Sequence, residues 1–161
     1  MRIGVVSDTH NHLRNVTRIV ALFNEAGVER VVHTGDITQP KTLDVLAGLH
    51  APLVGVYGNN DLERAGLAAA AERHGFHLVD PPLELAWAGR RILVVHDPRE
   101  IEPALRSEHD VVLHGHEHRR VLERDGHRLI FNPGECAGHM PGLNAVGMLD
   151  LVSLEAELLR F

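Results

Sequence analysis

The chain has 161 residues, of which 44% are hydrophobic and only 4% aromatic, and this composition predicts a single globular domain over residues 1–161 with an aliphatic core. Its formal charge of −6 argues against a general nucleic-acid surface, which would be basic, and its one cysteine excludes an intrachain disulfide. The first apolar run is too short for a signal peptide or a membrane span, so we expect a cytoplasmic protein without a membrane partner.

The first strand is predicted by the β-branched apolar run Ile3–Val6, which is typical of a strand buried on both faces. Polar residues follow it at once. Asp8 and His10 are one residue apart, so an extended backbone would point both side chains the same way and form half of a metal site. The alternative is that Asp8 or Thr9 only caps the helix that follows.

Two more strands of the first half also end in polar side chains. The expected elements here are a helix over Leu13–Ala26, a strand over Val31–His33, a helix from Thr38 or Pro40 to the break at Pro52 with an inward stripe of Leu43, Leu46 and Leu49, a strand over Leu53–Tyr57, and a helix over Leu62–Arg73. The second strand leads into Asp36, and the third leads into Asn59, Asn60 and Asp61.

The second half consists of short strands joined by tight turns. The expected elements are hairpin strands over Leu83–Trp87 and Arg91–Val95, a helix over about Arg99–Arg106, a strand over Val111–Leu113, hairpin strands over Val121–Arg124 and His127–Phe131 around Asp125-Gly126, and a last hairpin of Val146–Val152 and Leu154–Leu159. We interpret this half as mainly antiparallel. Together, the two halves predict an α/β fold in which helices flank a two-sheet β-sandwich.

Ligand-type side chains thus stand at the ends of five predicted strands. They are Asp8, His10, Asp36, Asn59, His96, His116 and His118. Oxygen and imidazole ligands without thiolate suit manganese, zinc, iron, cobalt or nickel. Seven ligands are too many for one tetrahedral ion, whereas two ions that share a carboxylate would use them all.

The order of these motifs resembles that of the calcineurin-like metallophosphoesterases. In its length and layout the chain resembles most the small bacterial and archaeal phosphodiesterase branch of that family. The shared motifs are Asp-x-His at Asp8, Gly-Asp at Asp36, Gly-Asn-x-Asp at Asn59, an isolated His96 and Gly-His-x-His ending at His118, followed by a closing turn like Asn132-Pro133-Gly134. The resemblance covers Asp8 to His118 and implies that family's fold.

The resemblance also implies a ligand set and a reaction. One ion would be held by Asp8, His10, Asp36 and His118, and the second by Asp36, Asn59, His96 and His116. Asp36 would be the bridge, and Asp36, Asn59 and His96 would be catalytic. Two divalent ions, manganese first and otherwise zinc, iron, nickel or cobalt, would generate a bridging hydroxide that hydrolyses a small phosphate ester, most naturally a diester.

The chain departs from the family pattern at two positions. Asn60 occupies a site that is often histidine, and an amide cannot protonate a leaving group, which predicts a preference for diesters with acidic leaving groups. Asp61, which would orient that histidine, is then expected to cap the helix beginning at Leu62. Glu135 occupies a position that is often serine, where a carboxylate would repel phosphate unless it faced away.

Other residues near the motifs have looser roles. Asn60, His12 and His139 are candidates for substrate contacts, although a solvated surface is the default for the two histidines. His33 and His114 are expected in the core or beside the ligands, and Cys136 as a buried, incidental thiol.

Rival functions are a protein-interaction scaffold that keeps the fold, a phosphomonoesterase or nucleotidase, and, more weakly, a nuclease. The intact ligand positions favour an enzyme over a scaffold. A homo-oligomer stays open.

Overall fold

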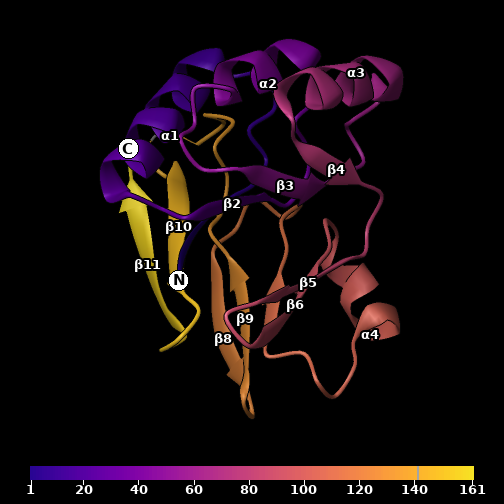
Figure 1. The fold of residues 1–161 in the computed structure, drawn as a ribbon, viewed down its shortest axis with the longest axis vertical. Helices are drawn as coiled ribbons and strands as arrows, with labels where there is room; N and C mark the ends of the chain where they lie inside the picture. The colour runs from indigo at the N-terminus through magenta and orange to yellow at the C-terminus, as the bar shows by residue number, and fades with distance from the viewer. Residues whose placement is uncertain (141) are drawn as a thin grey trace.

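Two β-sheets pack face to face in the computed structural model, which describes residues 1–140 and 142–161, and helices cover their outer faces (Figure 1). The expected fold class is confirmed. The six-stranded sheet has the order β11-β10-β1-β2-β3-β4, with β1 Arg2–Val6, β2 Arg30–His33, β3 Leu53–Val56, β4 His77–Val79, β10 Ala145–Asp150 and β11 Glu155–Arg160. The five-stranded sheet has the order β5-β6-β7-β9-β8, with β5 Leu83–Trp87, β6 Arg90–Val94, β7 Val111–Leu113, β8 Val121–Asp125 and β9 Arg128–Asn132.

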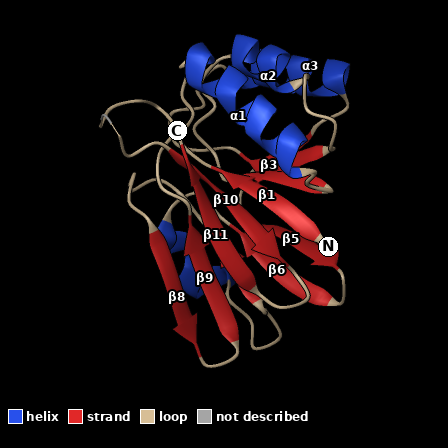
Figure 2. Ribbon diagram, turned by 90° about the vertical axis from the view of Figure 1, so that its left-hand side faces the viewer, coloured by secondary structure: helices blue, strands red, loops and turns tan. Residues whose placement is uncertain are grey.

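Three helices, α1 Leu13–Ala26, α2 Pro40–Leu46 and α3 Arg64–His74, lie along the outer side of the six-stranded sheet (Figure 2). On the second sheet lies the four-residue α4, Ile101–Ala104, preceded by the 3-10 turn Pro98–Glu100. None of the helices in the described ranges is both long and apolar enough to cross a membrane.

The core has three apolar layers, and β1 contributes to two of them because it is apolar on both faces. Ile3 and Val5 join the layer between the sheets, whereas Val6 packs under the helices with Phe23 of α1. A Cβ at Gly4 would lie 2.7 Å from the Phe23 ring, so only glycine lets α1 approach β1 this closely. The third, smaller layer lies between the second sheet and α4.

Parallel pairing places the ends of the central strands at one edge of the sandwich. Val6 of β1 pairs with His33 of β2, which pairs with Gly55 of β3. In the second sheet β6, β7 and β9 are also parallel, with Leu113 of β7 between Val94 and Phe131. The carboxyl ends of such strands are where α/β sheets bind ligands.

The prediction of a mainly antiparallel second half is confirmed for four of the six strand pairs that its described residues form, namely β5–β6, β8–β9, β10–β11 and β1–β10. The parallel pairing of β6, β7 and β9 was not predicted. The hairpin β8–β9 was expected, but β8 lies at the sheet edge and returns the chain so that β9 pairs with β7. The strand β4 was not predicted. Its three residues are at least partly exposed and show no apolar alternation, so a local pattern does not reveal it.

Several element boundaries also differ from the predicted ones. The helix α2 ends at Leu46, so Leu49 lies beyond the helix, and the predicted helix at 99–106 is only a 3-10 turn plus α4. The last hairpin is shorter at its turn, because β10 ends at Asp150 and β11 begins at Glu155. The helix α3 begins two residues later than expected, for a reason found at the site.

Candidate metal centre

The loops that follow β1, β2 and β7 hold their polar residues in left-handed backbone conformations. Positive φ angles occur at Asp8 (49°), His10 (43°), Asp36 (60°), His116 (72°) and His118 (53°). Few residues other than glycine adopt such angles, and those that do gather at functional sites, where the surrounding structure holds them. The expectation that an extended backbone aligns Asp8 and His10 is wrong, because β1 ends before both and the chain turns there.

The loops after β1 and β2 are joined by main-chain hydrogen bonds. The Asp8 N–H donates to the Gly35 carbonyl at 3.1 Å, and the His10 N–H donates to the Asp36 carbonyl at 2.8 Å. These bonds replace the sheet ladder beyond the strand ends. They bring the side chains of Asp8, His10 and Asp36 to one place, although the strands themselves have stopped.

The first group of converging side chains is Asp8, His10, Asp36 and His118, whose ligand atoms lie within 4.8 Å of one another. Asp8 is fully buried, and its Oδ1 lies 3.5 Å from His118 Nε2. His10 Nε2 lies 3.7 Å from Asp36 Oδ2. Neither Asp8 Oδ1 nor His10 Nε2 has a hydrogen-bond partner among the described residues. Buried polar atoms without partners are rare, and a cation between these four side chains would satisfy both.

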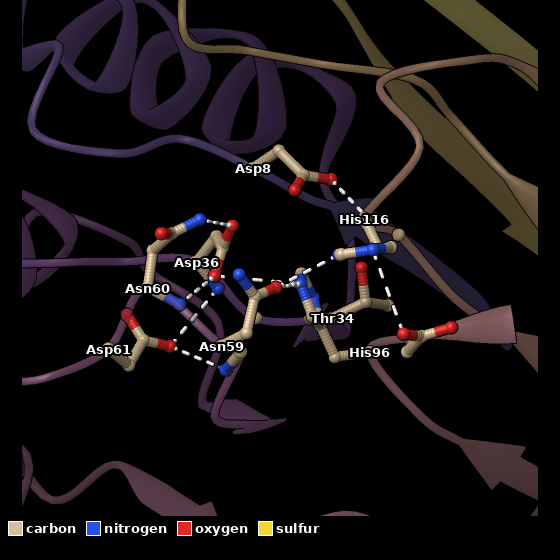
Figure 3. Close-up of polar contacts among 12 residues, drawn as sticks. Asp8, Thr34, Asp36, Asn59, Asn60, Asp61, His96 and His116 are labelled. Atoms are coloured by element: carbon tan, nitrogen blue, oxygen red, sulfur yellow. Dashed lines mark hydrogen bonds and ion pairs between the residues drawn. The ribbon is translucent and has the colours of Figure 1, made fainter. Parts of the chain in front are cut away.

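A second group meets at the side chain of Asn59 (Figure 3). Asn59 Oδ1 lies 3.0 Å from His96 Nε2 and 2.9 Å from His116 Nδ1, and His96 Nε2 lies 3.5 Å from Asp36 Oδ1. Asp36 therefore presents one oxygen to each group. The loops after three strands of the first sheet and two strands of the second sheet contribute these side chains. The site therefore lies where the two sheets meet at their carboxyl edge.

The outer ring nitrogens of three imidazoles face oxygen atoms. His96 Nδ1 lies 2.8 Å from the Thr34 carbonyl, and His116 Nε2 lies 3.6 Å from Asp97 Oδ2. His118 Nδ1 lies 3.1 Å from a Glu135 carboxylate oxygen. The Thr34 carbonyl and the Glu135 carboxylate lie within hydrogen-bond distance and accept a hydrogen bond from the outer N–H, which leaves the inner nitrogens of His96 and His118 with their lone pairs directed at the site. Asp97 is too far from His116 for a hydrogen bond and places a negative charge beside that ring.

Burial perturbs the protonation of the first group. Desolvation raises the pKa of Asp8, against the hydrogen bond from Ser7 Oγ, and desolvation lowers the pKa of His10, against the charges of Asp36 and Asp8. A divalent cation would favour the ionised Asp8 and the neutral His10 together. By contrast, hydrogen bonds from Arg99 lower the pKa of Asp97 to about 2, so Asp97 keeps its negative charge beside His116.

The candidate substrate contacts have partners of their own. Asn60 donates its side-chain amide to Asp36 Oδ2 at 2.7 Å and its main-chain N–H to Asp36 Oδ1 at 2.9 Å. His12 is the N-cap of α1, where its Nδ1 accepts from the Asn15 N–H at 3.3 Å. The alternative of an Asp8 or Thr9 cap is therefore wrong. His139 is largely exposed and stacks on His118, with ring centroids 5.3 Å apart.

Asp61 does not cap α3, contrary to the expectation. Its buried carboxylate accepts the N–H groups of Asp36 at 3.0 Å, Thr38 at 2.6 Å and Gly58 at 2.6 Å. The N-cap position of α3 is Glu63. Asp61 instead ties the loop after β3 to the loop after β2, and α3 begins only after the chain has left this contact (Figure 3).

Glu135 is expected to repel phosphate unless it faces away, and in the structure it is a buried neighbour of His118. Its place directly after the Asn132-Pro133-Gly134 turn was the one signal available in the sequence. Two histidines are buried as expected: His33 accepts from the Gly35 N–H through Nδ1 at 3.1 Å, and His114 lies in the loop after β7. Burial raises the pKa of the Cys136 thiol, which is therefore unreactive.

Two cavities adjoin the cluster. One of about 300 Å³ is bordered by Asn59 and His96, and it shares Asp97 with a neighbouring cavity of about 610 Å³. Another of about 360 Å³ is bordered by His118 and Arg120. The site is therefore open beside both groups of side chains.

Known proteins resemble the whole chain. The family model described as the calcineurin-like phosphoesterase superfamily domain matches residues 1–153. Phosphodiesterase MJ0936 of Methanocaldococcus jannaschii is 34% identical over 154 residues, 93% of each chain, and phosphodiesterase YfcE of Escherichia coli K12 is 27% identical over 168 residues, 93% of this chain and 88% of its own. A solved structure of an archaeal phosphodiesterase superposes with a TM-score of 0.92 at 32% identity, covering 100% of both chains. Vps29 of Entamoeba histolytica shares the fold, with a TM-score of 0.66 at 16% identity over 100% of this chain and 99% of its own.

Proposed function

The chain belongs to the calcineurin-like phosphoesterase superfamily, and on that premise we propose that it hydrolyses small phosphodiesters at a centre of two divalent ions. The observation that supports this most directly is the buried Asp36, which presents one carboxylate oxygen to His10 and the other to His96. A carboxylate between two sets of ligands is what a dinuclear site requires. When bound, two such ions lower the pKa of a water molecule and neutralise phosphoryl oxygens during in-line attack.

We assign the ligands by the two groups in the structure. The first ion would be held by Asp8, His10, Asp36 and His118, and the second by Asp36, Asn59, His96 and His116. Because the first set has two carboxylates, manganese is the metal we propose, with zinc, iron, nickel and cobalt compatible with the same donors. The single cysteine supports the cytoplasm as the proposed location.

The chain's own residues prepare the site. The Thr34 carbonyl accepts a hydrogen bond from the outer nitrogen of His96, so this imidazole presents a lone pair inward, and the Asp97 carboxylate places a negative charge 3.6 Å from the outer nitrogen of His116. Asn60 donates two hydrogen bonds to Asp36 and thereby limits its rotation. Pre-positioned ligands lose little freedom when a cation binds, which favours affinity.

Two features support a diester as the substrate. A diester has two organic substituents, and the cavities beside Asn59 and His118 offer a place for each, whereas a monoester would need only one. Position 60 is an asparagine whose amide is bonded to Asp36, so no imidazole at this position can protonate a poor leaving group. Diesters with acidic leaving groups make the smallest demand for such a proton.

The test combines metal content with an activity screen of matched aryl diesters, aryl monoesters and nucleotides. We expect the wild-type protein to bind two equivalents of Mn²⁺ and to favour the diester in kcat/KM. Asp36→Asn should lose most of the metal and nearly all hydrolysis. Asp44→Asn is the control, because Asp44 is an exposed carboxylate paired with Arg73 and His74 on the helices.

Three results would each contradict a part of this proposal. An Asp36→Asn protein that kept both metal equivalents and normal turnover would rule out the shared carboxylate. Hydrolysis that continued in excess chelator, with metal content measured as zero, would rule out the metal centre itself. A wild-type protein that favoured the monoester would leave the centre intact and overturn the substrate class.

A further inference from the structure

A buried carboxylate lies behind the site, on the side of His118 that faces away from Asp8. The Glu135 side chain is 0% exposed, and its Oε2 lies 3.1 Å from His118 Nδ1 and 3.6 Å from His139 Nδ1. Its Oε1 accepts the Met140 N–H at 2.8 Å. A desolvated carboxylate is costly unless hydrogen bonds offset the loss of water, and the contacts with His118 Nδ1 and the Met140 N–H supply that offset.

The loop that carries Glu135 is tied to both sheets. Asn132 accepts the Gly134 N–H at 2.9 Å and donates its amide to the Gly115 carbonyl at 3.1 Å, in the loop that leads to His118. The Cys136 N–H donates to the Asp8 carbonyl at 3.2 Å. Glu135 is therefore held between the loop of Asp8 and the loop of His118, so its position is set by the main chain.

The contact determines which ring nitrogen of His118 carries the proton. The Met140 N–H donates to Oε1, and the carboxylate can only accept from the imidazole, so Nδ1 is the protonated nitrogen. Nε2 then has its lone pair directed towards Asp8 Oδ1, 3.5 Å away.

Three histidines of the site therefore follow one pattern. An oxygen atom faces the outer nitrogen of each ring: Glu135 faces His118, the Thr34 carbonyl faces His96, and Asp97 faces His116. This oxygen lies within hydrogen-bond distance for His118 and His96 and at 3.6 Å for His116, and in each case the inner nitrogen faces the other ligand-type side chains.

From this geometry we propose that Glu135 is a positioning residue of the metal centre: it fixes the tautomer and the orientation of His118 and holds His139 against that ring. The proposal rests on the function proposed above. The His139 ring lies nearly parallel to His118, at 5°, and its centroid is 5.3 Å from that of His10. One carboxylate thus orders a ligand and an exposed imidazole at the mouth of the site.

An alternative occupant is a separate cation held by His118, Glu135 and His139, whose ligand atoms lie within 4.8 Å of one another. A neutral imidazole has one lone pair, so His118 cannot bind such a cation through Nδ1 and also present Nε2 to an ion beside Asp8. Because Asp8 Oδ1 has no other partner among the described residues, the inward orientation is the one the structure favours.

The experiment measures the tautomer directly. Long-range ¹H–¹⁵N NMR of the metal-free wild-type protein should show His118 protonated at Nδ1, and titration calorimetry with Mn²⁺ should show two equivalents. Glu135→Met removes the acceptor at similar length, and it should mix the two tautomers and weaken one Mn²⁺ equivalent by about 10- to 100-fold. Glu135→Gln keeps an acceptor oxygen, so it should retain the tautomer and most of the affinity.

The control is Glu84→Gln. Glu84 Oε1 lies 3.8 Å from Nε2 of the buried His109, so this substitution removes a carboxylate beside an imidazole outside the site. It should change neither the His118 tautomer nor the Mn²⁺ affinity. A wild-type His118 protonated at Nε2 would overturn the proposal without any variant. So would a folded Glu135→Met protein with unchanged tautomer and affinity, or a Glu135→Gln protein that lost one whole equivalent, since Glu135 would then be a ligand. A wild-type protein that bound no metal would instead refute the proposed function, and the tautomer of the metal-free protein would still be measured.

Discussion

Replacing Asp61 with asparagine tests whether this carboxylate joins the two loops that carry Asp36 and Asn59. In the variant, the asparagine oxygen can still accept from the Asp36 and Gly58 N–H groups. The asparagine NH₂ group, however, then faces the Thr38 N–H, which in the wild-type protein donates to a carboxylate oxygen at 2.6 Å. A donor that loses its acceptor in a buried place costs about 1–3 kcal/mol, and bonds to a neutral oxygen are weaker than bonds to a charged one. Burial raises the pKa of Asp61, so removing the charge recovers part of this cost. We expect a loss of about 2 kcal/mol in the free energy of unfolding.

The assay is urea unfolding of the metal-free protein, followed by circular dichroism, together with Mn²⁺ calorimetry. Asp61→Asn should unfold at lower urea and bind Mn²⁺ more weakly, because both loops are loosened. The matched control, Asp80→Asn, removes an exposed carboxylate whose pairing with Arg64 should contribute less than about 1 kcal/mol. An Asp61→Asn protein within about 0.5 kcal/mol of wild type would refute the reasoning, since that range is typical of surface substitutions. Destabilisation with unchanged metal affinity would show that Asp61 stabilises the fold without ordering the site.

Two further predictions concern a close approach of main chain and a buried histidine. Gly115→Ala should abolish tight metal binding, because the added Cβ would collide with Ser7 Oγ and lie 2.8 Å from Asp8 Oδ2. The control is Gly126→Ala, whose Cβ meets nothing within 4 Å and which should leave the calorimetric Mn²⁺ affinity unchanged. Equal Mn²⁺ affinities of the two variants would contradict the prediction. Burial lowers the pKa of His33 from 6.5 to about 3, so between these pH values the imidazole binds a proton in the unfolded chain but not in the folded protein. The free energy of unfolding should therefore fall as the pH falls from about 6.5 towards 3, by at most about 1.4 kcal/mol per pH unit. His33→Asn, which keeps an acceptor for the Gly35 N–H, should flatten this dependence in urea unfolding of the metal-free protein, and an unchanged slope would show that His33 does not cause it.

Local patterns in the sequence were sufficient for much of the fold. The apolar run at 3–6, the helical spacing over 13–26 and the Asp125-Gly126 turn each reflect interactions between residues close in the chain, and each element was found. The same holds for ligand-type residues at strand ends, because a strand that stops at a polar motif is visible in a single stretch of residues. Pairing direction was not visible: β7 and β9 are parallel only because β8 intervenes at the edge, and no local pattern encodes that return.

The partners of the polar side chains were decided by the tertiary structure. From the sequence alone, Asp61 had the pattern of a helix cap and Glu135 that of a repulsive charge on the rim. The fold places Asp61 against N–H groups 20 or more residues earlier in the chain as well as the nearby Gly58, and Glu135 against the ring of His118. Residue type and spacing determine which side chains can bind a cation, because that is a property of their donor atoms. Which oxygen orients which imidazole depends on burial and on contacts between distant segments, and these exist only once both sheets have packed.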